Sequence, residues 1–252
     1  MSGSPKQIYF ATRKKHDQLW NIYVARPIAS VIVWVVAPTR ATPNQLTLAS
    51  LAIFLVGTAL LAELGTPLGG LVAVGVIEIS YLFDCADGML ARHKKLASRE
   101  GHLFDFFTDE SKALALTAGL AVRLYRTGGL APDLTPWPAG SPAFLLAGVG
   151  AVLVVASGLS LTNFVRRPEL TGKAGAVEAH YETADHAPPT SIVGRVAAIS
   201  MTFLRFLNHY PSHVWVFAIA GRFDVFFWMY ASLNLLYLAK GWLGLVLRFG
   251  RS

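Results

Sequence analysis

The sequence predicts an all-α integral membrane protein, with six transmembrane helices preceded by an N-terminal juxtamembrane amphipathic helix. Of its 252 residues 54% are apolar and only 15% are charged, whereas soluble domains carry about 25% charged residues. Several mostly apolar stretches reach the roughly 20 residues that a helix needs to cross a bilayer. The single cysteine, Cys85, excludes a disulfide scaffold. We therefore interpret residues 1–252 as one membrane domain.

Residues 1–40 are expected to form a cytosolic and juxtamembrane segment. The stretch Leu19–Val36 is moderately apolar, but it contains Arg26 and Pro27. A charged residue within such a stretch favours a helix that lies along the membrane surface over one that crosses it.

Residues 41–248 are expected to form the transmembrane bundle. The first span begins at Thr42-Pro43-Asn44, where an N-cap residue precedes a proline at the first helical position. The first four spans and the last one are predicted at Ala41–Ala62, Gly69–Arg92, Gly101–Val122, Ala143–Val165 and Phe223–Leu247.

The fifth span is harder to place from the sequence. Ser191–Leu207 carries two arginines and looks like an interfacial amphipathic helix, and Pro211–Gly221 is apolar but too short to cross a bilayer. We expect a short fifth span, or one built from parts of both segments.

The net charge of +7 is distributed unevenly. Basic residues gather before the first span, between the second and third, and after the fourth and last, whereas Glu63–Gly69 and Thr127–Pro142 hold almost none. By the positive-inside rule, both termini and the loop 166–190 are cytosolic. We interpret the basic residues as topology signals and contacts to anionic ligands, and we expect no nucleic-acid partner.

Acidic residues concentrate at the cytosolic ends of the second and third spans, where charge is costly and indicates a function. Seven of the fifteen lie between Glu78 and Glu110. Two helical stripes result when the residues are followed at intervals of three and four. They comprise Asp84, Asp87, Gly88 and Ala91 on the second span, and Gly101, Asp105, Asp109 and Lys112 on the third.

The connection His93–Glu100 folds the two helices antiparallel, so that the stripes can face each other. Four converging carboxylates repel one another unless cations hold them, and oxygen ligands favour Mg²⁺ or Mn²⁺. Two such ions would form a centre for phosphoryl chemistry. Gly88 and Gly101 remove side chains beside the acids and let a ligand approach the backbone.

The two stripes together read Asp84-x2-Asp87-Gly88-x2-Ala91-Arg92-x8-Gly101-x3-Asp105-x3-Asp109. This pattern resembles the full signature of the CDP-alcohol phosphotransferase family, with every position filled. The start of the first span, Thr42-Pro43-Asn44-Gln45-Leu46-Thr47, and the six-span plan are also similar to the family.

The resemblance implies transfer of a substituted phosphate from a CDP-alcohol to the hydroxyl of a second alcohol, with release of CMP. It implies that Asp84, Asp87, Asp105 and Asp109 bind two metal ions and that Asp109 is also the catalytic base. It further implies that Gly88, Ala91 and Arg92 border the CDP, and it suggests a homodimer.

Other residues near this site have two interpretations each. Asn44 and Thr47 either cap and pack the first span or contact the cytidine. Lys112 either only compensates charge, or it lowers the pKa of the base or holds an anionic acceptor. Arg166 and Arg167 either anchor the fourth span or bind an acceptor phosphate.

The resemblance implies an enzyme of phospholipid biosynthesis, and we expect it in a bacterial or archaeal plasma membrane. CDP-diacylglycerol with a polar acceptor alcohol is the preferred pair, because basic residues beyond the motif could receive an anionic alcohol. CDP-choline or CDP-ethanolamine with diacylglycerol, and CDP-inositol giving a soluble product, are alternatives. A divalent-cation transporter is an alternative of another class, but it predicts acids spread along a path rather than gathered near one face.

Overall fold

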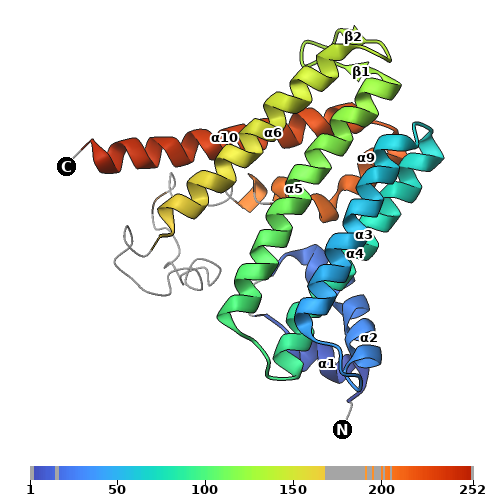
Figure 1. Cartoon of the computed structure of the whole chain (residues 1–252), viewed down its shortest axis with the longest axis vertical. Coiled ribbons are helices and arrows are strands. Elements are labelled where there is room, and N and C mark those ends of the chain that lie inside the picture. Colours follow the sequence, from blue (N-terminus) through green and yellow to red (C-terminus); the bar gives the residue numbers. More distant parts are fainter. Residues whose placement is uncertain are drawn as a thin grey trace.

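The computed structural model describes residues 3–14, 17–167, 191, 195, 200, 202–204 and 206–250 (Figure 1). Within these residues the fold is helical, apart from one pair of two-residue strands. The long helices are α3 (Pro43–Glu63), α4 (Pro67–His93), α5 (Arg99–Thr127), α6 (Pro142–Val165) and α10 (Phe223–Phe249). The shorter elements are α1 (Pro5–Thr12), a π-helical turn (Asn21–Ala25), α2 (Arg26–Val36), β1 (Gly129–Leu130), β2 (Pro136–Trp137), a 3-10 turn (Tyr210–Ser212) and α9 (Val214–Ala220).

Side-chain caps fix where α3, α4, α5 and α6 begin. At α3, Thr42 and Gln45 form a reciprocal capping box, and Pro43 fills the first helical position. The start predicted for the first span is therefore confirmed. The helices α4, α5 and α6 also begin after a hydroxyl N-cap, provided by Thr66, Ser98 and Ser141.

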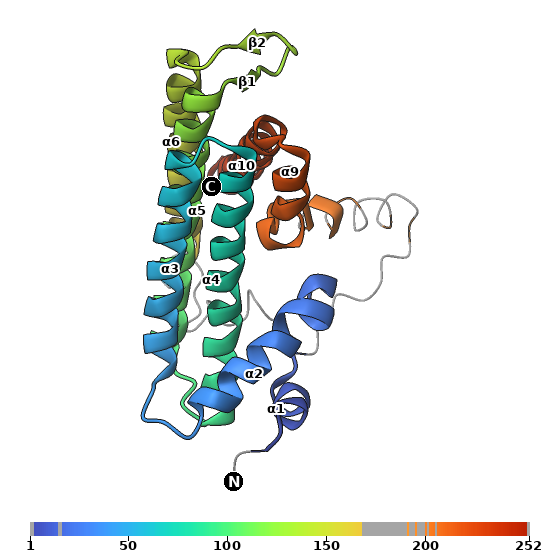
Figure 2. The same cartoon turned by 90° about the vertical axis from the view of Figure 1, so that its right-hand side faces the viewer.

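Helices α3, α4, α5 and α6 run alongside one another and enclose the main core (Figure 1, Figure 2). Phe54, Ile77, Leu120 and Phe144 are fully buried in it, one from each helix. Small residues let the backbones approach closely: a Cβ added at Gly148 of α6 would lie 2.3 Å from the Cβ of Ala121 on α5. Such contacts between small residues are typical of helices that associate in membranes.

The N-terminal helices pack against the C-terminal part of α4, at the end of the bundle that we call the cavity end (Figure 2). Ile8 of α1 and Val33 of α2 join Met89 and Leu90 of α4 in a second apolar cluster. Helix α2 lies within the predicted juxtamembrane stretch. Helix α1 is an addition to the prediction, and it begins with its own capping box at Ser4.

The strands β1 and β2 lie at the opposite end, which we call the hairpin end, where Gly129 pairs with Trp137. Arg123 of α5 donates hydrogen bonds to the carbonyl oxygens of Leu61, Leu64 and Thr66, and so satisfies the end of α3. From this end α10 crosses the bundle instead of running along it (Figure 1). Many apolar side chains in its second half are exposed.

The long helices can be compared with the predicted membrane spans. Four of them, α3, α4, α6 and α10, are long and apolar enough to cross a membrane. Helix α5 runs within the bundle over the predicted third span, but it carries more charge than those four. For the fifth span the structure describes α9, which has only seven residues. Most of Ser191–Leu207 and residues 168–190 lie outside the described residues, so the count of six spans stays a prediction.

Candidate active site

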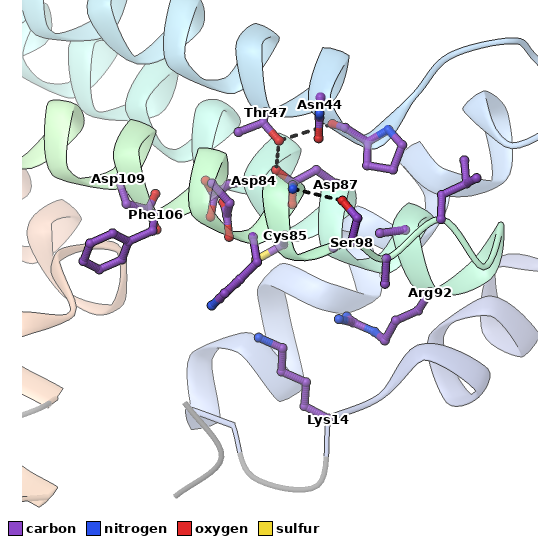
Figure 3. A pocket seen from close by; sticks show the side chains of 18 of the residues that line it. Lys14, Asn44, Thr47, Asp84, Cys85, Asp87, Arg92, Ser98, Phe106 and Asp109 are labelled. Atoms are coloured by element: carbon purple, nitrogen blue, oxygen red, sulfur yellow. Dashed lines mark hydrogen bonds between the residues drawn. The ribbon is translucent and has the colours of Figure 1, made fainter. Parts of the chain in front are cut away.

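A cavity of about 320 Å³ opens at the cavity end, between the N-terminal segment, the start of α3, the second half of α4 and the first half of α5 (Figure 3). It is lined by every residue that the sequence assigns to metal or CDP. These are Asn44, Thr47, Asp84, Asp87, Gly88, Ala91, Arg92, Gly101, Asp105 and Asp109. The antiparallel arrangement of α4 and α5 therefore brings the two predicted stripes to one site.

Three of the four aspartates form a compact carboxylate cluster, which consists of Asp84, Asp105 and Asp109. Each offers one oxygen, and these oxygens all lie within 4.8 Å of one another. The Oδ1 atom of Asp105 is buried and has no hydrogen-bond partner among the described residues. A hard divalent cation suits such a set of ligands, because it would satisfy an unpartnered carboxylate oxygen and offset the repulsion between three acids.

The fourth aspartate, Asp87, is not a member of this cluster. Its Oδ2 accepts a hydrogen bond of 2.5 Å from the hydroxyl of Thr47, which ties the start of α3 to α4 (Figure 3). Asp87 is buried and still lines the cavity. Thr47 thus acts as a contact between helices through its hydroxyl, and a role in binding the cytidine stays a prediction.

Glycines keep the cavity open beside the aspartates. A Cβ added at Gly88 would meet nothing closer than the guanidinium of Arg92, at 3.5 Å. At Gly101 the nearest atoms would be the side-chain oxygens of Ser98 and Asn44, at 3.2 and 3.3 Å. The space at Gly88 is therefore left to a ligand, as the sequence predicted for a group that approaches the backbone.

We compared the chain with models of known protein families. The model of the CDP-alcohol phosphatidyltransferase family matches residues 40–177, which include the whole acidic motif and helices α3 to α6. The chain belongs to the CDP-alcohol phosphatidyltransferase family. A search of curated proteins finds no match to it.

Membership makes the chain part of a transferase family associated with phosphatidyl transfer in phospholipid synthesis. The family generally uses divalent metals, and the carboxylate cluster of Asp84, Asp105 and Asp109 is compatible with that use. The four long apolar helices also agree with an integral membrane protein.

The residues predicted to bind the acceptor do not line the cavity. Lys112 is buried behind the cluster, where its ammonium contacts Asp84 and lies 3.1 Å from Oδ1 of Asp109. The guanidinium of Arg166 lies over the ring of Phe106, 4.8 Å from its centroid, and Arg167 is exposed. Lys112 therefore compensates charge, and acceptor binding by these three residues stays a prediction.

The N-terminal segment supplies part of the cavity wall that the sequence analysis missed. Lys14, Asp17, Asn21 and Arg26 line the cavity, together with Tyr81 of α4. The sequence predicts only topology signals for the basic residues and a surface helix for the stretch that contains Asn21 and Arg26. The signal available in the sequence was Arg26. A helix on the membrane surface does not require a charge within its apolar stretch, so this residue could have indicated a functional site.

A hydrogen-bond network holds this wall together. Asp17 pairs with Arg26 and accepts a hydrogen bond of 2.8 Å from Asn21, and the hydroxyl of Tyr81 donates to Asn21 at 2.6 Å. Burial by itself would raise the pKa of Asp17, but the hydrogen bond from Asn21 and the charge of Arg26 lower the pKa overall. Asp17 therefore serves as an ionised anchor for Arg26.

Proposed function

We propose that this chain is a metal-dependent membrane enzyme that transfers a substituted phosphate group from a CDP-alcohol to an acceptor hydroxyl and releases CMP. One observation carries the proposal: three motif aspartates converge within 4.8 Å in the same cavity that the motif glycines leave open. The carboxylate cluster and the open space beside the glycines are therefore neighbours. A ligand in which a pyrophosphate is joined to a nucleoside requires such an arrangement.

The charges of the site support two ions of Mg²⁺ or Mn²⁺. Asp84, Asp87, Asp105 and Asp109 carry four negative charges when ionised, and Lys112 compensates one of them. The aspartates would hold the ions, which when bound would neutralise the pyrophosphate and stabilise the leaving group. Two divalent ions would leave the site slightly positive, which suits an anionic substrate.

The transfer itself needs one base from the protein. We assign it to Asp109, which would accept the proton of the acceptor hydroxyl while that oxygen attacks the β-phosphorus. The new phosphorus–oxygen bond forms as the bond to CMP breaks. Direct attack is favoured because no side chain of the motif is an obvious covalent nucleophile.

Gly88, Ala91, Arg92 and Gly101 are proposed to border the CDP, with Asn44 and Thr47 at the start of α3 close to the nucleotide. The preferred donor is CDP-diacylglycerol and the preferred acceptor a polar alcohol. The alternatives are the transfer of choline or ethanolamine phosphate to diacylglycerol, and a CDP-inositol reaction. Incubation of the purified protein with a panel of CDP-alcohols and acceptors, followed by assay of CMP, would identify the pair.

The variant Asp109→Asn tests the assigned base. It keeps the shape of the side chain but cannot take a proton, so we expect CMP release to fall by about a hundredfold or more. Glu110→Gln is the matched control, because Glu110 is the next residue and hydrogen-bonds to Asn163 outside the cavity. Thermal unfolding should show both variants folded. An Asp109→Asn variant as fast as the wild type would exclude this residue as the base.

Removal of metal tests the role of the carboxylate cluster. We expect EDTA to stop CMP release, and excess Mg²⁺ or Mn²⁺ to restore it, because the aspartates cannot approach an anionic pyrophosphate without cations. The measurement is initial rate against free metal concentration. Full activity in the chelator would overturn metal dependence while leaving the family assignment intact.

We further propose that the cavity end faces the cytosol of a bacterial or archaeal plasma membrane, and that the enzyme is a homodimer. The basic residues near the cavity end support this orientation. The exposed apolar side chains of α10 would lie against lipid or a second copy of the chain.

A further inference from the structure

Three basic side chains line the same cavity as the carboxylate cluster. Lys14 follows α1, Arg26 begins α2 and Arg92 lies in the last turn of α4. In Figure 3, Lys14 lies below the aspartates, Arg92 lies to the right of the view and Asp109 to the left. We call these three residues the basic group.

Two members of the basic group have buried nitrogens that find no hydrogen-bond acceptor among the described residues. Arg26 uses its Nε to contact Asp17, but its Nη1 is buried and has no acceptor among the described residues. Arg92 donates from Nε to the carbonyl oxygen of Thr12 at 3.0 Å, and in the described part of the chain its buried Nη2 also lacks an acceptor. A buried guanidinium nitrogen requires an acceptor, and the strongest acceptors for it are anionic oxygens.

Charge also accumulates at this side of the cavity. Asp17 pairs with Arg26, but neither Lys14 nor Arg92 forms an ion pair with any carboxylate of the described residues. Lys14 lies at the exposed mouth of the cavity. Desolvation and the charges of Arg26 and Arg92 lower its pKa overall, although the charges of Asp17 and Asp105 act in the opposite direction. An anion bound among the three would relieve this repulsion.

We propose that the basic group forms an anion subsite, beside the metal-binding aspartates, that binds a phosphate group of a substrate. The inference rests on the proposed function, which brings phosphate to this cavity. A phosphate could come from the β position of the CDP-alcohol or from a phosphorylated acceptor alcohol. Both sources present the same oxygens to the same donors.

The test compares two neighbouring lysine and arginine positions in the full-length protein purified in detergent. Lys14→Gln removes a charge from the cavity, whereas Arg13→Gln removes one from an exposed residue that does not line it. Calorimetry in the presence of Mg²⁺ would measure the affinities for CDP, for CMP, and for inorganic phosphate with CMP bound. Arg26→Lys is a second variant, which keeps the charge but removes the Nη1 donor.

If the subsite receives the donor phosphate, Lys14→Gln should weaken CDP binding by about fivefold and leave CMP binding unchanged. If it receives the acceptor phosphate, the same loss should appear for inorganic phosphate and not for CDP. Arg26→Lys should lower the same affinity by about tenfold, and Arg13→Gln should change neither.

Wild-type affinities in both Lys14→Gln and Arg26→Lys, or equal losses in Arg13→Gln, would overturn the subsite. Thermal unfolding would verify that Arg26→Lys is folded. Because these are binding measurements, they are independent of turnover. A wild-type protein that releases no CMP from any substrate pair would instead refute the proposed function.

Discussion

Single side chains position the aspartates of the site through contacts that have no catalytic role in the proposed reaction. Lys112 approaches Asp84 and Asp109 from behind the cavity, so one positive charge holds two carboxylates at the same place. Thr47 does the same for Asp87 with its hydroxyl. Because Lys112 and Thr47 are both buried, these contacts orient the acids before any ligand arrives.

Gly88 provides a test of the proposed nucleotide space at the residue scale. Gly88→Ala places a methyl group in the cavity and meets only the flexible end of Arg92 at 3.5 Å. We expect CMP release to fall by about tenfold or more, since a small displacement of the reacting groups is costly. Stability should rise slightly, because alanine is favoured over glycine within a helix by about 1 kcal/mol.

The matched control is Gly75→Ala on the same helix. Gly75 is exposed, and an added Cβ there meets no atom of the described residues within 4 Å. It should show the same gain in thermal stability with unchanged activity. Equal activities of the two variants would show that the space at Gly88 is not used by the substrate.

The motif residues could be placed from the sequence because their spacing is local. Asp84, Asp87 and Gly88 follow the helical repeat, so one face of α4 is fixed as soon as the helix is assigned. Apart from Arg92, which belongs to the motif, the basic group could not be found in this way. Lys14 and Arg26 reach the cavity only through the packing of α1 and α2 on α4, which a local pattern does not specify.

Contacts between elements determine whether α4 and α5 keep their stripes face to face. Helix α5 is supported on its other side by α6, where Gly148 approaches Ala121. Gly148→Ala would place two methyl carbons 2.3 Å apart and force the helices to separate. We expect a loss of about 1–3 kcal/mol in the free energy of unfolding, which is typical of overpacking.

Gly150→Ala is the control for this prediction, since it lies on the same helix with open space around its Cβ. Thermal unfolding of both variants in detergent measures the difference. Equal midpoints would mean that α5 and α6 are not held by this contact.

Element boundaries were predicted well where caps and connections define them. The span predicted at Ala143–Val165 appears as α6, Pro142–Val165, because Ser141 and Pro142 mark its start. The span predicted to end at Val122 continues to Thr127, because Arg123 is buried against the end of α3 instead of lying in a loop. A helix can thus continue past a charged residue when that residue donates hydrogen bonds to carbonyl oxygens of a neighbouring helix.

At the scale of the whole molecule, the candidate active site and the contacts that stabilise the bundle lie at opposite ends. The cavity, the carboxylate cluster and the basic group lie at one end of the bundle, and the β1–β2 hairpin and the Arg123 contacts lie at the other. The sequence predicted this polarity from the alternation of basic residues along the chain. It did not predict that α10 crosses the bundle, because an apolar helix of that length carries no signal for its direction.

The polarity leads to a prediction about orientation in the membrane. Arg92, Lys94, Lys95 and Arg99 surround the turn at the cavity end, so the positive-inside rule places that end in the cytosol. Cysteines introduced as Glu100→Cys and Asp133→Cys lie at exposed positions of opposite ends, and the native Cys85 is buried. In intact cells an impermeant maleimide should label Asp133→Cys only, and in inverted vesicles it should label Glu100→Cys only. Labelling of both from one side would contradict the bundle as a membrane-spanning unit, and the reversed pattern would place CMP release outside the cytosol.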